Sequence, residues 1–181
     1  MTSTEPTFNN YDNIFSILTG ATVLIKVSDR LAFNLDYTII RIFGSYGPNQ
    51  NLTWWGGPQA LFIEKAFKNK EIEIHGDGLQ TRSFCHISDF VKGFELILES
   101  KHGREMFNIG TREEVTISHL AEVIAVSLGR EINFSSSVAP LGETNRRVPD
   151  IAKLEELGFR QTVTIKDGVK EYCDWYLSTL L

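Results

Sequence analysis

The chain has 181 residues, of which 42% are hydrophobic and 23% charged, and its formal net charge is -5. This composition can bury one core and excludes a generally cationic nucleic-acid binder, which replaces phosphate counterions with a positive surface. No apolar run approaches the roughly 20 residues that span a bilayer, and residues 1–10 are too polar for a signal peptide. We therefore expect a cytoplasmic protein that needs no membrane. Cys85 and Cys173 lie in apolar segments without metal-ligand spacing, which predicts reduced, half-buried thiols and no metal site.

The first elements differ in how clearly the sequence defines them. Residues 1–10 form a polar lead, and residues 11–33 permit either a helix or, over the β-branched run at 21–27, a strand. Tyr37–Phe43 is almost continuously apolar and predicts a strand buried on both faces of a parallel sheet. Gly47-Pro48 then marks a turn.

Helical and strand patterns alternate over the rest of the chain. The sequence predicts a helix over Gln59–Lys68, a half-exposed strand over Glu71–His75 and a helix capped by Ser88 that ends near Ser100. A strand over Met106–Ile109 and a helix capped by Thr116 and ended by Gly129 follow. The last predicted elements are a short helix over Asp150–Leu157 and a helix from about Lys166 in which Val169, Tyr172 and Tyr176 share a face. This order predicts an α/β fold.

The segment Gly76–Asp89, GDGLQTRSFCHISD, carries the first candidate site residue. A glycine turn precedes Arg82, and glycines allow a backbone to approach a ligand closely. The planar guanidinium can donate to two phosphate oxygens together, which makes Arg82 a candidate anion ligand. The alternative is a hairpin turn that carries a surface arginine.

A second basic segment lies near the end of the chain. Arg146 and Arg147 precede Pro149 and Asp150, which suit a helix start, and the arginines could close over the anion that Arg82 holds. The alternative is a solvated basic turn paired with Glu143 or Glu155.

The segment Trp54–Gln59, WWGGPQ, places two adjacent tryptophans in a Gly/Pro-rich loop. Because such side chains are costly to leave in water, one should pack in the protein while the other is available to stack on a flat ligand such as a base. The alternative is loop packing alone. The four histidines lack ligand spacing, so we interpret them as structural or exposed, and Glu113-Glu114 as a solvated turn.

Taken in order, these segments resemble the carboxy-terminal half of the extended short-chain dehydrogenases that act on nucleotide sugars. The resemblance runs from about residue 36 to 177 and rests on five motifs: RIFGSYGP at Arg41–Pro48, GDGLQTRSFCHISD at Gly76–Asp89, FNIG at Phe107–Gly110, EVTISHL at Glu114–Leu120 and RRVPDIAK at Arg146–Lys153. It implies part of a Rossmann-type sheet together with the family's small substrate-binding domain, over residues 36–181, with 1–35 unassigned.

The resemblance also implies a ligand and a cofactor. Arg82 and one or both of Arg146 and Arg147 would hold the diphosphate of a nucleotide-diphosphate sugar. The other substrate-binding candidates are Gln80, beside Arg82 in its motif, and Trp55, Gln59 and Phe62, which would line the base or sugar pocket. The family's cofactor is NAD, and the WWGGPQ segment looks most like UDP-glucuronate decarboxylases or general nucleotide-sugar epimerases.

Several positions depart from the family pattern. We find neither the glycine-rich turn of a dinucleotide site nor a tyrosine followed four residues later by lysine, since Phe15 stands four residues after Tyr11. Gly44 replaces the usual asparagine, and Asn49 replaces a common basic residue.

These departures leave three hypotheses. In the first, the chain is an enzyme whose cofactor half comes from another chain, because hydride transfer requires a nicotinamide. In the second, which the motifs favour, it binds nucleotide sugars without turnover and has no catalytic residue of its own. In the third, it is an interaction or regulatory module that forms a homodimer or pairs with another chain through an exposed sheet edge.

Overall fold

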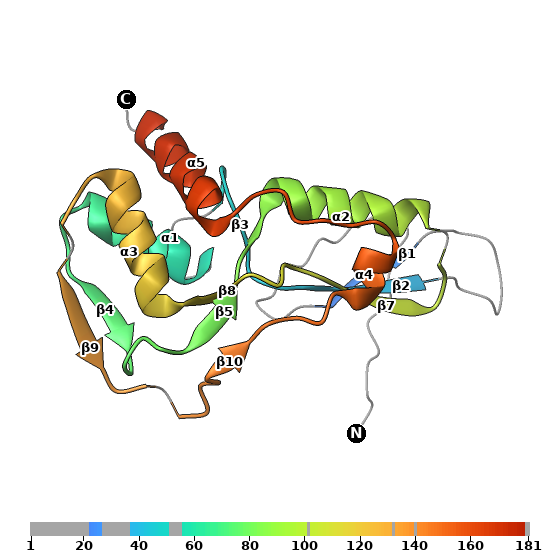
Figure 1. Ribbon diagram of the computed structural model, residues 1–181, viewed down its shortest axis with the longest axis horizontal. Coiled ribbons are helices and arrows are strands. Elements are labelled where there is room, and N and C mark those ends of the chain that lie inside the picture. The colour runs from blue at the N-terminus through green and yellow to red at the C-terminus, as the bar shows by residue number, and fades with distance from the viewer. Residues whose placement is uncertain are drawn as a thin grey trace, which may run out of the picture.

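The computed structural model describes residues 22–26 (backbone only), 37–50, 56–100, 102–131, 133–139 and 141–179. These residues form an elongated α/β molecule with two lobes (Figure 1). No helix among them is long and apolar enough to cross a membrane. The predicted fold class is confirmed.

The first lobe is built on a three-stranded sheet. Its order is β1 (Thr22–Lys26), β2 (Tyr37–Ile42), β7 (Glu105–Ile109), with β2 parallel to β7 and β1 antiparallel to β2. The helix α2 (Ile87–Glu99) lies along one face of this sheet, and the short helix α4 (Ala152–Glu156) packs beside β7 (Figure 1). Ile40, Phe107 and Leu154 belong to the core between them.

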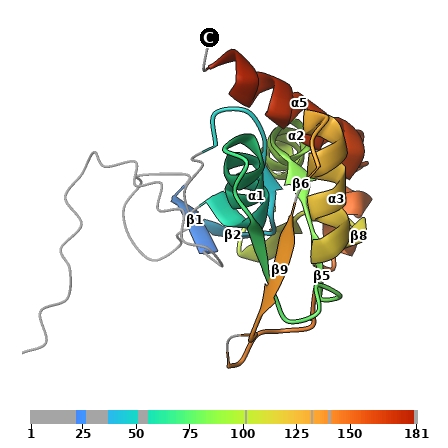
Figure 2. The same cartoon turned by 90° about the vertical axis from the view of Figure 1, so that its left-hand side faces the viewer.

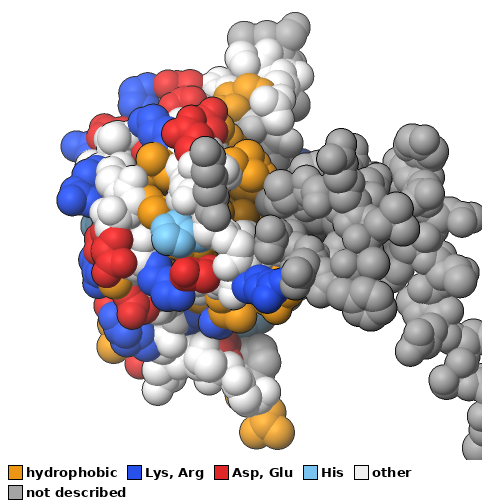
Figure 3. All heavy atoms as spheres, turned by 90° about the vertical axis from the view of Figure 1, so that its right-hand side faces the viewer, with side chains coloured by type: hydrophobic (Ala, Val, Ile, Leu, Met, Phe, Trp, Pro, Cys, Tyr) orange, Lys and Arg blue, Asp and Glu red, His pale blue; other side chains and the backbone are white. Residues whose placement is uncertain are grey.

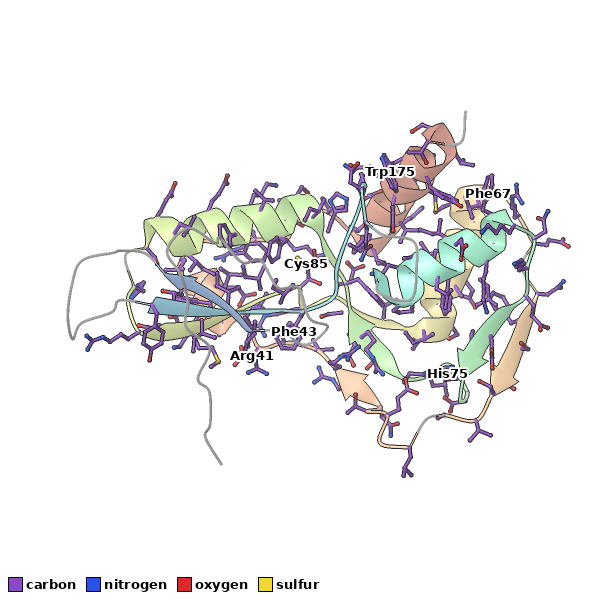
Figure 4. The ribbon with its side chains drawn as sticks, turned by 180° about the vertical axis from the view of Figure 1, so that it is seen from behind. Arg41, Phe43, Phe67, His75, Cys85 and Trp175 are labelled. Carbon is purple, nitrogen blue, oxygen red and sulfur yellow. The ribbon has the colours of Figure 1, made fainter. Side chains whose placement is uncertain are left out.

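The strand β2 is buried on one face, whereas the sequence predicted burial on both. Thr38 and Ile40 are buried, but Tyr37 and Arg41 on the other face are exposed. Arg41 instead lies over the ring of Phe43, 5.5 Å from its centroid (Figure 4). The apolar run therefore misled the prediction, because a strand with one exposed face can still carry apolar residues along both faces.

The second lobe packs three helices over short strands. These helices are α1 (Gly57–Phe67), α3 (Ile117–Leu128) and α5 (Ile165–Ser178). The strands of this lobe form the parallel pair β4 (Ile72–His75) and β9 (Phe134–Ser137), and the three-stranded sheet β10 (Arg146–Arg147), β5 (Thr81–Ser83), β8 (Glu114–Thr116). Figure 2 shows α1 and α3 above β4 and β9. Ile63, Leu120 and Val169 belong to the core of this lobe.

The lobes are joined through the parallel pair β3 (Ser45–Tyr46) and β6 (Cys85–His86), which lies between them (Figure 4). Gly44 precedes β3 with φ of 57°, and a Cβ there would collide with the carbonyl oxygen of Ser83. Glycine at this position is therefore required by the close approach of two backbone segments.

Most local predictions are confirmed within a few residues. The Thr116 hydroxyl accepts from the His119 amide at 3.1 Å, and Gly129 ends α3 with φ of 61°. The predicted cap of α2 at Ser88 is wrong, because the N-cap is His86. Its ring accepts from the Ser88 amide, so the helix begins two positions earlier than the sequence suggested.

Both cysteines are free and buried. They are fully buried rather than half-buried, and burial raises the pKa of each thiol to about 12. A thiol with so high a pKa is a poor nucleophile at neutral pH. These residues therefore serve as small apolar groups of the core.

Candidate anion site

The sheet β10-β5-β8 brings the distant arginines together. Arg146 lies opposite Thr81 and Arg147 lies opposite Arg82 in the parallel pairing of β10 with β5. Residues directly opposite one another point to the same face of a sheet, and neighbours along a strand point to opposite faces. Arg82 and Arg147 therefore share one face, and Arg146 points to the other.

Arg82 is a buried charge with few partners. It is 7% exposed, its Nη1 donates to the carbonyl oxygen of Thr81 at 2.8 Å, and its Nη2 donates to a Glu143 carboxylate oxygen at 3.2 Å. The pKa of Arg82 lies below its usual value because burial disfavours the charged form and Arg147 repels it. The attraction of Glu143 raises the pKa, but it only partly offsets these two effects. Among the described residues, Glu143 is the only carboxylate that pairs with Arg82.

Arg147 adds a second positive charge to the same face. Its side chain is exposed, and among the described residues it makes no ion pair with a carboxylate. Of the described carboxylates, only Glu143 pairs with Arg82, and none pairs with Arg147. Such an arrangement favours an anion that carries more than one negative charge.

Arg146 is neutralised on the opposite face. Its Nε and Nη2 donate to the two carboxylate oxygens of Glu114 at 2.8 to 3.1 Å. These hydrogen bonds lower the pKa of Glu114, with a further contribution from the Thr81 hydroxyl. Glu114, interpreted from the sequence as part of a solvated turn, instead holds Arg146 in a bidentate pair.

Bidentate pairing of an exposed arginine recurs elsewhere on the surface. Arg112 donates to both carboxylate oxygens of Glu155 at 2.8 and 2.6 Å. Figure 3 shows Lys and Arg side chains interspersed with Asp and Glu side chains at the end of the molecule that carries α4. Arg147 is one of several cations, Arg41, Lys65 and Lys70 among them, that have no ion pair with a carboxylate within the described part of the chain. What distinguishes it is its position opposite Arg82.

The remaining predicted site residues lie in different places. Gln80 is half-buried and donates to the carbonyl oxygen of His75 at 2.8 Å, next to the strand that carries Arg82. Gln59 is buried at the start of α1 and donates to the Gly56 carbonyl oxygen, and Phe62 is buried in the core between the helices. Trp55 lies outside the described residues.

The sequence analysis did not predict the contacts of two carboxylates at the junction of the lobes. Asp89, fully buried, accepts from the amides of Thr162 and Val163, both at 2.9 Å, and from the Thr162 hydroxyl at 2.6 Å. Glu113 accepts from the amide of Ile165 at 3.0 Å, at the start of α5. Both partners are some 50 to 75 residues away in sequence, separations at which no local pattern signals a contact.

The described residues show no dinucleotide site. Such a site needs a glycine-rich turn between a strand and a helix N-terminus. Of the described helices, α2 and α3 directly follow a strand, and His86-Ile87 and Thr116-Ile117 stand at these junctions. Neither junction contains glycine, so we assign no described residue to the pyrophosphate of NAD. No group of three or more potential metal ligands occurs among the described residues either.

Comparisons with known proteins show which family this chain is similar to. Residues 21–110 match the model of the NAD dependent epimerase/dehydratase family. A Putative UDP-glucose 4-epimerase of Methanocaldococcus jannaschii is 33% identical over 151 residues, which cover 83% of this chain and 48% of that protein. UDP-glucuronic acid decarboxylase 2 of Arabidopsis thaliana is 32% identical over 75% of this chain and 30% of its own length.

Solved structures agree with these matches. A UDP-glucose 4-epimerase from Thermotoga maritima, solved with UDP-glucose, superposes with a TM-score of 0.76 at 29% identity, over 81% of this chain and 48% of that one. A UDP-glucuronic acid 4-epimerase from Bacillus cereus, solved with UDP-glucuronic acid and NAD, gives a TM-score of 0.71 at 29% identity, over 78% and 45%. This chain belongs to the NAD-dependent epimerase/dehydratase family.

Membership of the epimerase/dehydratase family confirms the resemblance that the ordered motifs indicated. The chain spans about half the length, or less, of the curated relatives it matches. The activity and substrates of a whole epimerase are therefore a matter for proposal. The fold that the family shares is Rossmann-like, and the parallel strands β2 and β7 with helix α2 form the part of it that this chain contains.

Proposed function

We propose that this chain supplies the part of an NAD-dependent nucleotide-sugar epimerase or decarboxylase that holds the diphosphate of its substrate, with Arg82 and Arg147 as the anion ligands. The observation that carries the proposal is the position of buried Arg82 directly opposite Arg147 on paired strands, where Glu143 is the only carboxylate among the described residues that pairs with Arg82. Its pKa is lowered by burial and by Arg147, although Glu143 is within 3.2 Å. A diphosphate on this face would neutralise both arginines.

The sheet suits this task because it places both arginines on one face. Arg82 and Arg147 are directly opposite one another on paired strands. Arg82, which its hydrogen bonds already hold in place, loses little side-chain entropy when it binds a phosphate. In an enzyme, gripping the diphosphate in this way positions the sugar, because binding energy from a non-reacting part of the substrate is used to orient the reacting part.

The ligand class follows from the relatives. The solved relatives named above were crystallised with UDP-glucose or UDP-glucuronic acid. We therefore propose a UDP-sugar as the ligand, with NAD as the cofactor of the reaction. Gln80, next to the strand of Arg82, is the most plausible of the other predicted residues to contact the ligand, whereas buried Phe62 acts through packing.

Calorimetric titration tests this proposal. The wild-type chain is titrated with UDP-glucuronate, UDP-glucose and dTDP-glucose, and the titrations are repeated with Arg82→Ala. We expect affinity for the preferred ligand to fall at least about tenfold, the loss that one charge-assisted contact produces. Arg146→Ala is the matched control, since it removes an adjacent arginine that faces away from the site. Equal affinities in wild type and Arg82→Ala would overturn the proposal.

Turnover is a separate measurement. NAD-dependent conversion of any bound UDP-sugar would support the enzymatic part of the proposal, and binding without conversion would leave the chain as a binding domain. The alternative of an interaction module would use β1 or β7, which are the edge strands of the sheet β1-β2-β7. Light scattering after size exclusion tests it, since a monomer at all concentrations argues against pairing.

A further inference from the structure

Glu143 occupies an unusual position for a surface carboxylate. It lies 61 residues from Arg82 in sequence, and the only contact recorded for it in the described part of the chain is the one with Arg82. The side chain of Arg82 is 8% exposed and that of Glu143 is 26% exposed, so the pair joins a buried guanidinium to a carboxylate that water can reach. An anion that binds Arg82 would therefore meet Glu143 as a competitor for the same guanidinium.

The segment that carries Glu143 has few anchors. Residues 141–144 are exposed, and Gly142 has φ of 85° with nothing within 4 Å of a Cβ built there. The first anchors after them are Asn145, which accepts from the Thr81 amide at 2.7 Å, and Arg146, which pairs with Glu114. By contrast, Arg82 lies within β5, between β10 and β8. If the pair separates, the glutamate is the partner that moves, since an exposed segment with few contacts opens at low cost.

From these observations we propose that Glu143 is an internal counter-ion, which neutralises Arg82 in the free protein and is displaced when the diphosphate binds. This inference rests on the proposed function. A guanidinium has five N–H donors, and the two bonds to Thr81 and Glu143 leave others with which a phosphate can bind directly beside the carboxylate. Two anions on one guanidinium repel each other, however, and this repulsion favours displacement of the carboxylate.

This arrangement predicts opposite effects of Glu143 on stability and on affinity. In the free protein the carboxylate stabilises a buried charge that would otherwise lack a counter-ion. On binding, its contact with Arg82 must be broken, which lowers the apparent affinity for the ligand. A direct role in binding, in which the Glu143 carboxylate accepts a hydrogen bond from the ligand, predicts the reverse effect on affinity.

The decisive variant is Glu143→Gln, which keeps the shape of the side chain and removes its charge. We expect UDP-sugar to bind about three- to tenfold more tightly, while the free variant unfolds at a lower urea concentration than wild type. Glu114→Gln is the matched control, because it removes the same charge from the Arg146 pair on the opposite face. It should change affinity less than about twofold.

A double-mutant cycle separates this inference from the proposed function. In Arg82→Ala the further change Glu143→Gln should have no effect on affinity beyond about twofold, because the pair no longer exists. If Arg82→Ala weakens binding but Glu143→Gln weakens it or leaves it unchanged, the counter-ion role is wrong and the diphosphate site stands. If Arg82→Ala has no effect, the site itself is wrong.

Discussion

Asp89 and Arg82 are both buried charged side chains, yet the chain satisfies them to different degrees. Asp89 accepts two backbone amides and a hydroxyl, and the Lys92 ammonium lies 3.5 Å away. Burial alone would raise its pKa, but these donors lower it overall, so the protein favours the carboxylate. The pKa of Arg82 is lowered as well, which for an arginine means that the protein disfavours the charged form.

The comparison separates a structural charge from one that is available to a ligand. A buried ion whose hydrogen bonds are all made by its own chain stabilises the fold and has little left to offer. A buried ion whose charge is only partly compensated gains from a partner in solution. By this criterion Asp89 fastens α2 to Thr162 and Val163, whereas the incomplete compensation of Arg82 is consistent with the binding role that we propose for it.

The largest effect should follow the loss of Asp89. Asp89→Ala leaves two backbone amides without an acceptor, and we expect the free energy of unfolding to fall by about 3 kcal/mol. Urea denaturation measures it. Glu95→Ala on the same helix is the control, because Glu95 is exposed and should change stability by less than about 0.5 kcal/mol. Similar losses in both variants would mean that Asp89 is not a special contact.

Acid should reproduce part of this loss. The folded pKa of Asp89 lies below its usual value, so its contribution to stability is complete above about pH 4 and disappears as the pH falls through the folded pKa. The variant Asp89→Asn should therefore lose less stability than wild type between neutral pH and pH 3. Parallel stability curves for the two proteins over that range would contradict the assignment.

The next largest effect concerns Arg82, whose replacement should reduce affinity strongly and stability little. Arg82→Met keeps most of the volume of the side chain and removes an incompletely compensated charge, so we expect stability to change by less than about 1 kcal/mol. UDP-sugar affinity should nevertheless fall at least about tenfold. Urea denaturation and calorimetry on the same preparation check both. A variant that loses stability as severely as Asp89→Ala would show that Arg82 is structural.

Arg147 should have a smaller effect. Arg147→Ala removes an exposed cation that adds to the positive charge around Arg82, and we expect binding to weaken about three- to tenfold with little loss of stability. Raising the salt concentration should reduce the difference from wild type, since exposed charges are screened. If Arg146→Ala weakens binding more than Arg147→Ala does, Arg146 and not Arg147 is the second anion ligand.

These residues show best how much of the site could be predicted from the sequence. The order of the motifs predicted that Arg82 and the Arg146-Arg147 pair meet, and the sheet does bring them together. The sequence left open which arginine of the pair faces Arg82, because that depends on the strand register, and a shift of one residue reverses the faces. Glu143 was foreseen as a partner of the Arg146-Arg147 turn, whereas the structure pairs it with Arg82.

Other features depended on contacts between distant segments. The role of Asp89 could not be read from its position near a helix start, because its partners lie 73 and 74 residues away. Gly44 looked like the loss of a ligand residue, but the close approach of Ser83 gives it a structural reason. In both cases the tertiary arrangement, and no local pattern, determines what the residue does.

The smallest effect should come from the exposed pair on the far face of the sheet. Arg146→Ala removes the hydrogen bonds that lower the pKa of Glu114, so this pKa should rise toward its ordinary value. An NMR titration of the Glu114 side-chain carboxyl measures that shift. Because both side chains are largely solvated, thermal stability at neutral pH should fall by only about one or two degrees, and UDP-sugar affinity should stay within about twofold. In wild type this pair stabilises the fold slightly at pH values above the ordinary pKa of a glutamate. The stabilisation is lost as the pH falls through the lowered pKa of Glu114, so the stabilities of wild type and Arg146→Ala should converge in acid. A large loss of affinity in Arg146→Ala would show that the site uses both faces of the sheet, and the distinction between a compensated and an uncompensated arginine would fail.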